Sequence, residues 1–426
     1  MHAELEVVDI YDLGSSGDGV ARLDDGAVVF VPGGLPGDRV EIRRQRKRKG
    51  VYWAHLENIL EPSPDRITSL CREDACGGCH LKNLEGQRQK KLKRQRIVET
   101  VRRIGGVDIE EVLGPVLEIG DGWHYRHRVR LHCRWHNKRW RLGLFARKSH
   151  RLIALKDCPV LWPELLNTAH SIEKLIVDLP RSVGLHEIEI VYSRRDGKAA
   201  AFFDVQGDVE PCRDLLGDLP LENLIGIEIA NGVQQRRLGK LLLRYDHAQA
   251  QSYDLFFEPG LFTQTFPAAN DKLVEAVNDF VRPDTQPKVL ELHAGVGNFS
   301  TSLARQGAEL TASEINPNAA LLCKRNLRTM GLANDVWILD DVAALEKESG
   351  PWDVVLLDPP RTGAAAAVKR LAQERPERIV YVSCDPATFA RDCKTLMEVG
   401  YTLKNIKAIE MFPQTTHVEM VALLAR

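Results

Sequence analysis

The stretch that decides the fold of this chain is KVLELHAGVGNFS, residues 288–300. An apolar run of strand length ends there at Gly295 and Gly297, and a helical pattern follows. Such glycines let the backbone approach a ligand where the next helix begins. Further strand candidates alternate with helices: AELTASEI (308–315), DVWILDDV (335–342), WDVVLLDPP (352–360), RIVYVSCDP (378–386), KNIKAIEMF (404–412) and HVEMVALLA (417–425). This alternation predicts a doubly wound α/β domain with a mainly parallel sheet.

Acidic residues stand where three of these strands end. In an open α/β sheet, ligands bind beyond the carboxyl ends of the parallel strands. Glu314 follows the glycines by about twenty residues, where an acid accepts ribose hydroxyls. Asp341 is placed for an adenine amino group, and Asp358 ends the fourth strand. Phe299 and Ser300 occupy the region where a dinucleotide site needs a third glycine, so we predict S-adenosylmethionine, which has no phosphate.

A thiol and a carboxylate are predicted to meet at the same edge. Cys384 follows the fifth strand and precedes a helix whose positive end is expected to activate it. Glu419 begins the last strand, which is predicted to run antiparallel from that edge. Either residue alone is more typical of a buried small side chain or a helix cap. Together they indicate chemistry at carbon 5 of uracil.

The pair matches what carbon 5 of uracil requires. This carbon is a poor nucleophile until a thiolate adds to C6 and makes it enolate-like. After methyl transfer, the C5 hydrogen must leave so that the cysteine is eliminated. We therefore predict Cys384 as nucleophile and Glu419 as base.

The first third of the chain has the pattern of an RNA-binding region. Its first sixty residues alternate apolar and polar positions between glycine turns, which predicts a small β-barrel. The stretch GDGVARLDDGAVVFVPGGLPGDRVEI (17–42) resembles the TRAM domain, an RNA-binding barrel of the OB type. The net charge is only −1, but basic residues cluster in runs at 43–49, 88–103 and 126–151, and the third run interleaves aromatic residues. RNA is the predicted partner.

Four cysteines have the spacing of a metal site. Cys71, Cys76 and Cys79 fall in CREDACGGC, and Cys158 follows in KDCPV. Three close thiols with a distant fourth can bind a four-iron cluster or zinc, and spacing alone leaves both open. The chain has nine cysteines and no secretory signal, so a disulfide framework is not expected.

Five motifs carry a resemblance over nearly the whole chain: FTQTF (262–266), HAGVGNF (293–299), DPPRTG (358–363), SCDPATFARD (383–392) and MFPQTTHVEM (411–420). In this order they resemble the uridine C5 RNA methyltransferases, which act on 23S ribosomal RNA and on the tRNA T-loop. The resemblance implies a class I methyltransferase fold and 5-methyluridine as product. It also implies a 4Fe-4S cluster rather than zinc on the four cysteines, as in the ribosomal members. The implied cofactor residues are Gln264, His293, Asn298, Glu314, Asp341 and Asp358.

The chain departs from the family pattern at two places. His293 and Ala294 stand where an aromatic residue and often a cysteine are usual. Phe266 stands where an asparagine is usual, and whether Asn270 replaces it is left open.

We expect three units along the chain. They are a TRAM-like barrel (1–61), a central β-rich iron-sulfur region (62–83 and 123–253) and the methyltransferase domain (84–122 and 254–426). No stretch of eighteen apolar residues occurs, so we expect a cytoplasmic protein without a membrane segment, and a monomer. Ribosomal RNA is favoured as substrate over transfer RNA.

Three other functions are weighed. An amino-group methyltransferase also places an acid before two prolines but usually has an aromatic residue next, where this chain has Arg361. A cytosine C5 enzyme carries its cysteine in a different loop. A non-catalytic iron-sulfur protein that binds RNA has no need of Cys384 and Glu419.

Overall fold

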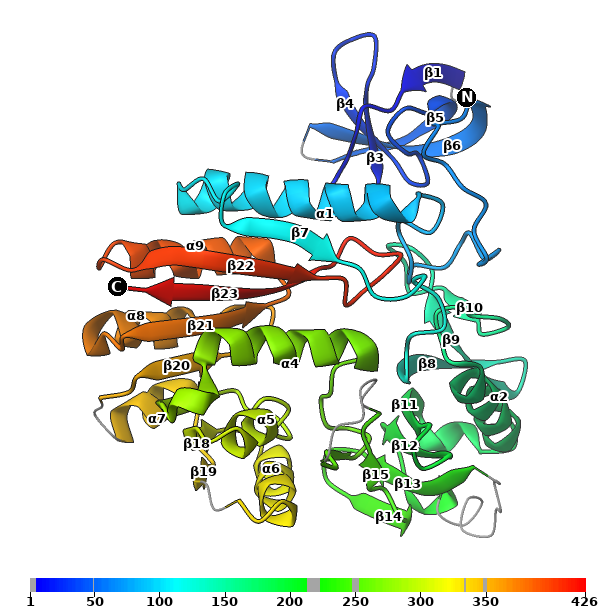
Figure 1. Cartoon of the computed structure of the whole chain (residues 1–426). Coiled ribbons are helices and arrows are strands. Elements are labelled where there is room, and N and C mark those ends of the chain that lie inside the picture. Colours follow the sequence, from blue (N-terminus) through cyan, green and yellow to red (C-terminus); the bar gives the residue numbers. More distant parts are fainter. Residues whose placement is uncertain (1–4, 49, 213–222, 247–252, 333–334, 348–350) are drawn as a thin grey trace.

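The computed structural model describes residues 5–48, 50–212, 223–246, 253–332, 335–347 and 351–426 (Figure 1). Lys49, which belongs to the first basic run, lies outside these residues. The described strands form sheets of six, seven and eight strands and a two-stranded one. No helix among the described residues has the length and apolar character needed to span a membrane.

The N-terminal sheet has the strand order β1-β5-β6-β4-β3-β2. Its strands are β1 (Leu5–Asp9), β2 (Asp12–Leu13), β3 (Gly19–Arg22), β4 (Val28–Val31), β5 (Arg39–Arg48) and β6 (Val51–Glu61). Buried positions alternate with less buried ones along β3 and β4, so one face of each strand packs inward. The inward residues, among them Val29, Val31, Val40 and Ile42, form a core of their own.

The central sheet is mixed and has the order β10-β9-β8-β11-β12-β13-β14. Its elements are β8 (Arg128–His136), β9 (Arg139–Phe145), β10 (Leu152–Ala154), α2 (Pro163–Ile176), β11 (Leu185–Ser193), β12 (Lys198–Val205), β13 (Leu224–Ala230) and β14 (Gln235–Gly239). The small sheet of β15 (Leu243–Arg244) and β16 (Phe256–Phe257) follows. Strands β12 and β13 pair in parallel and the other neighbours are antiparallel, which confirms the predicted β-rich middle region.

The C-terminal sheet has the order β19-β18-β17-β20-β21-β23-β22-β7. Its strands are β7 (Leu113–Leu117), β17 (Lys288–Leu292), β18 (Glu309–Ser313), β19 (Asp335–Trp337), β20 (Val354–Leu357), β21 (Arg378–Ser383), β22 (Thr402–Ile409) and β23 (Glu419–Ala425). Only β23 runs antiparallel to its neighbours. The predicted doubly wound α/β sheet is therefore confirmed, although the third strand is shorter than its apolar pattern indicated.

Helices cover both faces of this sheet (Figure 1). The helices are α1 (Gly86–Thr100), α4 (Pro267–Val281), α5 (Ser300–Arg305), α6 (Pro317–Thr329), α7 (Asp341–Lys347), α8 (Ala365–Glu374) and α9 (Pro386–Met397). Helices α4 and α5 share a core with Val289 and Val354, whereas α1, α8 and α9 share one with Leu290 and Val355. Adjacent residues of a strand point to opposite faces, so each strand contributes to both cores.

Candidate active site

Cys384 lies in the turn between β21 and α9. Asp385 caps the helix, because its carboxylate accepts hydrogen bonds from the backbone nitrogens of Ala387 (2.9 Å) and Thr388 (3.0 Å). Pro386 takes the first helical position, where its missing N–H is not needed. The thiol therefore stands between the end of a buried strand and the positive end of a helix.

Glu419 lies opposite this turn because of the strand register. Ser383, the last residue of β21, pairs with Met420 of the antiparallel β23. The next pair in that register is Cys384 and Glu419. The Glu419 side chain is only 4% exposed, and burial raises the pKa of its carboxyl well above the usual value, with Asp358 adding to the effect. A carboxyl in such surroundings becomes a strong base once it is ionised.

The pKa of Cys384 differs from what the helix end predicted. Burial raises the pKa of its thiol to about 11, and the negative charges of Glu419 and Asp358 act in the same direction. The charge of Arg361 and its hydrogen bond to the thiol lower the pKa but do not outweigh burial. Arg361 is thus a member of the site that the sequence analysis used only to exclude another enzyme class. The sequence feature that could have identified Arg361 is a cation directly after the strand end in DPPRTG.

The predicted cofactor residues gather at the end of β17. A cavity there is lined by Gln264, His293, Asn298 and Asp358. Burial raises the pKa of Asp358 to about 7, and the neighbouring His293 opposes this shift. The other two acids border the same turn: Glu314 accepts a hydrogen bond from the backbone nitrogen of Gly295 (2.9 Å), and Asp341 lies 3.5 Å from the His293 ring.

The two departures from the family pattern have distinct structural consequences. His293 has a positive φ of 61° and points its Nε2 toward Asp341. Asn270 is fully buried on α4 and exchanges two hydrogen bonds with Asn298, of 2.7 and 2.9 Å. Asn270 therefore orients the Asn298 amide, and Phe266 packs in the core instead.

Glu291 is a further buried acid at this site that the sequence analysis did not select. It lies within β17, accepts a hydrogen bond from the Ser300 hydroxyl (2.6 Å), and its Oε1 has no partner among the described residues. Burial raises the pKa of this carboxyl to about 8. The sequence feature that could have identified Glu291 is an acid inside the otherwise apolar strand KVLEL.

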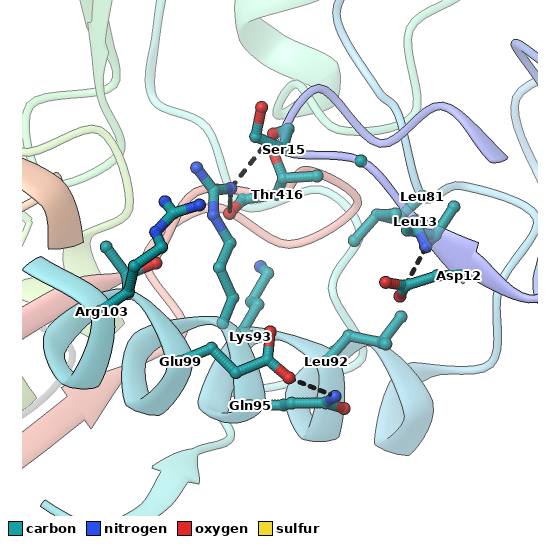
Figure 2. Close-up of a pocket in the computed structure, with 13 residues that line it drawn as sticks. Asp12, Leu13, Ser15, Leu81, Leu92, Lys93, Gln95, Glu99, Arg103 and Thr416 are labelled. Atoms are coloured by element: carbon teal, nitrogen blue, oxygen red, sulfur yellow. Dashed lines mark hydrogen bonds between the residues drawn. The ribbon is translucent and has the colours of Figure 1, made fainter. Parts of the chain in front are cut away.

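Helix α1 holds the loop that precedes Glu419, residues 410–418, which we call the β22–β23 loop. Gln89, Lys93 and Arg96 lie on one face of α1 and each contacts this loop. Gln89 and Gln414 exchange two hydrogen bonds, of 3.0 and 3.1 Å. Lys93 forms a buried ion pair with Glu410 and donates a hydrogen bond to Phe412 O (3.0 Å). Arg96 donates a hydrogen bond to Thr416 O (3.1 Å; Figure 2). The position of Glu419 thus depends on a helix more than three hundred residues earlier in the chain.

Replacing Lys93 with alanine is expected to lower the free energy of unfolding by about 3–5 kcal/mol, because it leaves Glu410 charged and buried without its partner. Chemical denaturation followed by circular dichroism measures this change. The matched control is Lys91→Ala, on the exposed side of the same helix, which should change the value by less than about 0.5 kcal/mol. Equal effects of the two substitutions would contradict the importance of this ion pair.

The four predicted metal-binding cysteines line one cavity of about 200 Å³. Burial raises the pKa of Cys79 to about 12, and the nearby thiols of Cys158, Cys76 and Cys71 contribute to this shift. Within the described residues, however, no three His, Cys, Asp or Glu side chains are close enough to hold a single metal ion.

The segment from Cys71 to Leu81, which contains three of the four cysteines, also contacts two other parts of the molecule. The backbone nitrogen of Gly77 donates to Phe145 O (3.0 Å) in the central sheet, and that of Leu81 donates to Gln414 O (2.9 Å) in the β22–β23 loop. The sequence analysis found nothing that brought the cluster near the reacting pair. In the structure, the segment that contains Cys71, Cys76 and Cys79 is hydrogen-bonded to the β22–β23 loop, which precedes Glu419.

Comparisons with known proteins show the family to which this chain belongs. Residues 247–426 match the family tRNA (Uracil-5-)-methyltransferase, and residues 4–47 match the TRAM domain. Proteins described as 23S rRNA (uracil(1939)-C(5))-methyltransferase RlmD are similar over almost their whole length. The one from Shewanella sp. (strain ANA-3) is 32% identical, covering 97% of this chain and 94% of the relative, and that of Dichelobacter nodosus is 32% identical, covering 98% of both.

A solved structure extends the similarity to three dimensions. The Pyrococcus abyssi tRNA (uracil-54, C5)-methyltransferase in complex with S-adenosyl-L-homocysteine has a TM-score of 0.76 and 26% identity, covering 98% of this chain and 99% of that one. An enzyme, rather than a non-catalytic RNA-binding protein, is thereby confirmed. The chain belongs to the RNA (uracil-5-)-methyltransferase family and is an S-adenosylmethionine-dependent enzyme with an N-terminal TRAM domain.

Proposed function

We propose that this enzyme forms 5-methyluridine in 23S ribosomal RNA, with Cys384 as nucleophile and Glu419 as base. The observation that carries the proposed chemistry is the antiparallel register in which Ser383 pairs with Met420, since it brings Cys384 opposite Glu419. The ribosomal target is supported by the relatives named RlmD, which match along 94–98% of their length. The alternative substrate is uridine 54 of transfer RNA, on which the P. abyssi enzyme acts.

The proposed reaction uses the residues in sequence. The Cys384 thiolate adds to C6 of the uracil, and the electron pair of the C5–C6 bond moves toward C5 and the O4 carbonyl. When bound, S-adenosylmethionine supplies the methyl group that C5 takes up. Glu419 then removes the C5 proton, and the returning electron pair re-forms the C5–C6 bond as the sulfur leaves. Arg361, beside the thiol, stabilises its anionic form at the start and at the end.

The residues at the end of β17 fit the cofactor. Glu314 retains carboxylate lone pairs for ribose hydroxyls after its bonds to Gly295 and Asn316. The unpartnered Oε1 of the buried Glu291 is suited to a cationic amino group. Gly297 has a φ of +92°, and a Cβ there would lie 2.9 Å from the Cys323 sulfur, so only glycine fits the turn. Gln264, His293, Asn298, Asp341 and Asp358 complete the proposed binding residues.

The four cysteines are proposed to hold a 4Fe-4S cluster. In such a cluster each thiolate binds a different iron atom, so the sulfurs lie further apart than the four ligands of one zinc ion. The four thiols share one cavity, and four separate cysteine ligands are what such a cluster requires. The cluster would fasten the segment between the central sheet and the β22–β23 loop.

The proposed division of the chain follows the sheets. Residues 1–61 contain the N-terminal sheet, and residues 123–253 contain all seven strands of the central sheet. Residues 84–122 belong with 254–426, which is supported by α1 packing in the core of the C-terminal sheet and by β7 pairing with β22.

The target is tested with methyl-labelled S-adenosylmethionine and unmodified transcripts of 23S ribosomal RNA and of transfer RNA. We expect label in 5-methyluridine of the ribosomal transcript alone. Mapping that uridine in RNA from cells with and without the gene then identifies the position. Label only in the transfer RNA would support the alternative, and label in adenosine or cytidine would contradict the uridine chemistry.

The rate of methyl transfer is expected to rise between about pH 6 and pH 9, by up to about tenfold per pH unit. The attacking species is the thiolate, which is scarce at neutral pH because the pKa of Cys384 is about 11. Single-turnover rates at saturating RNA measure the profile. Arg361→Gln should move it to higher pH, since Arg361 lowers the thiol pKa. A flat profile would contradict rate-limiting thiolate formation.

Protein purified without oxygen is expected to contain iron and acid-labile sulfide in equal amounts and to absorb visible light. Cys79→Ser should remove both, because it deletes one of the four proposed ligands. Cys133→Ala, a buried thiol in β8 outside this cavity, is the control and should keep them. Stoichiometric zinc without iron would overturn the proposed cluster.

A further inference from the structure

Asp392 is a buried carboxylate that the proposed reaction does not use. It lies on α9, eight residues after Cys384, and its side chain is only 2% exposed. A charged carboxyl is costly to bury unless charged and polar partners surround it. The partners of Asp392 come from three different elements, and they show which part of the site this carboxylate holds in place.

The Asp392 carboxylate accepts hydrogen bonds on both of its oxygens. Oδ2 accepts one from the Tyr381 hydroxyl (2.7 Å) and one from the backbone nitrogen of Ala364 (2.8 Å). Oδ1 accepts from Nε and Nη2 of Arg391, at 2.8 and 2.7 Å. Tyr381 lies on β21, and Ala364 directly follows residues 358–363, which we call the DPPRTG turn. Asp392 therefore joins β21, α9 and the DPPRTG turn.

Two side chains of α9 hold the end of the DPPRTG turn. Besides the bond from Ala364 to Asp392, Arg391 donates from Nη2 to Thr362 O (3.1 Å). Gly363 lies between these two contacts with a φ of +76°, and a Cβ there would lie 2.6 Å from the Asp392 carboxylate. A residue with a side chain would be strained at this φ and would push the turn away from α9. The close approach of the turn to α9 thus requires glycine at this position.

Arg361 is the residue of the DPPRTG turn that acts on the reacting pair. It donates a hydrogen bond to the Cys384 thiol, and its positive charge acts on both Cys384 and Glu419. Arg361 is exposed and forms no salt bridge within the part of the chain that the structure describes. An exposed arginine without an ion pair can adopt many rotamers, so the position of its guanidinium depends on the backbone that carries it.

We propose that Asp392 is a positioning residue, which fixes the DPPRTG turn so that the Arg361 guanidinium stays beside the Cys384 thiol. Arg391 shares this role through its bond to Thr362. Asp392 acts through the turn and is not itself a catalytic residue. This inference rests on the proposed roles of Cys384 and Arg361.

Loss of this positioning should make the thiolate scarcer. The groups that face the Cys384 thiol are Arg361, Glu419 and Asp358. If Arg361 moves away, burial and the two carboxyl groups remain, and all of these raise the pKa of the thiol. Substitutions that release the turn should therefore slow every reaction that begins with the Cys384 thiolate.

The first experiment uses Arg391→Ala, because the Arg391 side chain is 45% exposed and its removal should preserve folding. The readout is alkylation of Cys384 by iodoacetamide at pH 9 without RNA, measured by mass spectrometry of the peptide that contains this residue. Only the thiolate reacts, so we expect the rate to fall about threefold, which is about half a pKa unit. Binding of S-adenosylhomocysteine should stay within about twofold.

The matched control is Lys394→Ala. Lys394 is an exposed cation on the same helix, so its substitution removes the same charge without touching the DPPRTG turn. It should change the alkylation rate by less than about 1.5-fold. Asp392→Ala, which deletes all of the acceptor bonds, should lower the rate by about tenfold. If this buried substitution prevents folding, the Arg391→Ala results decide.

The second experiment separates action through Arg361 from a general disturbance of the site. Arg391→Ala, Arg361→Gln and the double variant form a double-mutant cycle with the wild-type enzyme, again with the alkylation rate as readout. In the Arg361→Gln background no guanidinium is left to displace, so we expect Arg391→Ala to change the rate by less than about 1.5-fold. A merely structural role would lower the rate by the same factor in both backgrounds.

Three results would overturn the positioning role of Asp392 while leaving the uridine chemistry intact. They are alkylation of Arg391→Ala at the wild-type rate, alkylation of Arg361→Gln at the wild-type rate, and equal effects of Arg391→Ala in the two backgrounds. Failure of the proposed function would appear separately, as absence of label in uridine when the wild-type enzyme is given unmodified RNA and labelled S-adenosylmethionine.

Discussion

Cys384→Ala is expected to lower kcat/KM for RNA methylation by at least about 10⁴-fold, because the uracil ring is not activated without the thiolate. The substitution removes a half-buried side chain in a turn and leaves the Asp385 helix cap in place, so folding should be preserved. Transfer of labelled methyl to RNA measures the loss. Binding of S-adenosylhomocysteine, measured by calorimetry, should stay within about twofold, which separates lost chemistry from lost cofactor binding.

The control for this prediction is Cys393→Ala. Cys393 lies on α9, nine residues after Cys384, and is fully buried in the core. It should retain methylation activity at temperatures where the protein stays folded, although the small cavity will lower its stability. Methylation by Cys384→Ala at a rate close to that of the wild type would contradict the proposed nucleophile.

Glu419→Gln is expected to lower turnover by about 10²–10⁴-fold and, more tellingly, to trap the enzyme on its substrate. Addition of the thiolate and methyl transfer do not require Glu419 as a base, but release requires removal of the C5 proton. The amide cannot accept that proton, so the sulfur stays bonded to C6. Labelled methyl should then migrate with the protein as an RNA adduct on a denaturing gel.

Two further variants make this result specific. The double variant Cys384→Ala/Glu419→Gln should form no adduct, since no sulfur is available at position 384. Treatment of the trapped complex with ribonuclease should leave a labelled nucleotide on the peptide that contains Cys384. Normal turnover by Glu419→Gln, or stalling without an adduct, would show that another group removes the proton.

The sequence predicted the chemistry of the site better than its electrostatics. Strand ends, glycine turns and acids at fixed spacing are local features, so Glu314, Asp341, Asp358 and Cys384 were selected from their order along the chain. The pKa of Cys384 was predicted in the wrong direction. A helix end is visible in the sequence, whereas burial by residues from β21, β23 and the DPPRTG turn is not.

The structural roles of three further residues were not visible in the sequence. Asn270 looked like a possible replacement for a cofactor contact, but its amide is bound to Asn298 and its role is to orient that side chain. Glu291 and Arg361 were passed over because a single charged residue in a strand or a turn has many explanations. Only their surroundings, a buried carboxyl oxygen without a partner and a cation beside a thiol, distinguish them.

The sequence by itself determined the alternation of strands and helices and the TRAM-like start, and it supplied the set of proposed reactive residues, because hydrophobic period and motif spacing are properties of neighbouring residues. The sequence predicted that Cys384 and Glu419 share one edge of the sheet, but the tertiary structure decided the register of β21 and β23, in which Ser383 pairs with Met420. The tertiary structure also decided that α1 holds the β22–β23 loop through Gln89, Lys93 and Arg96, and that the TRAM domain contacts the same helix at Ser15. These features depend on contacts between segments far apart in the chain, which no local pattern records.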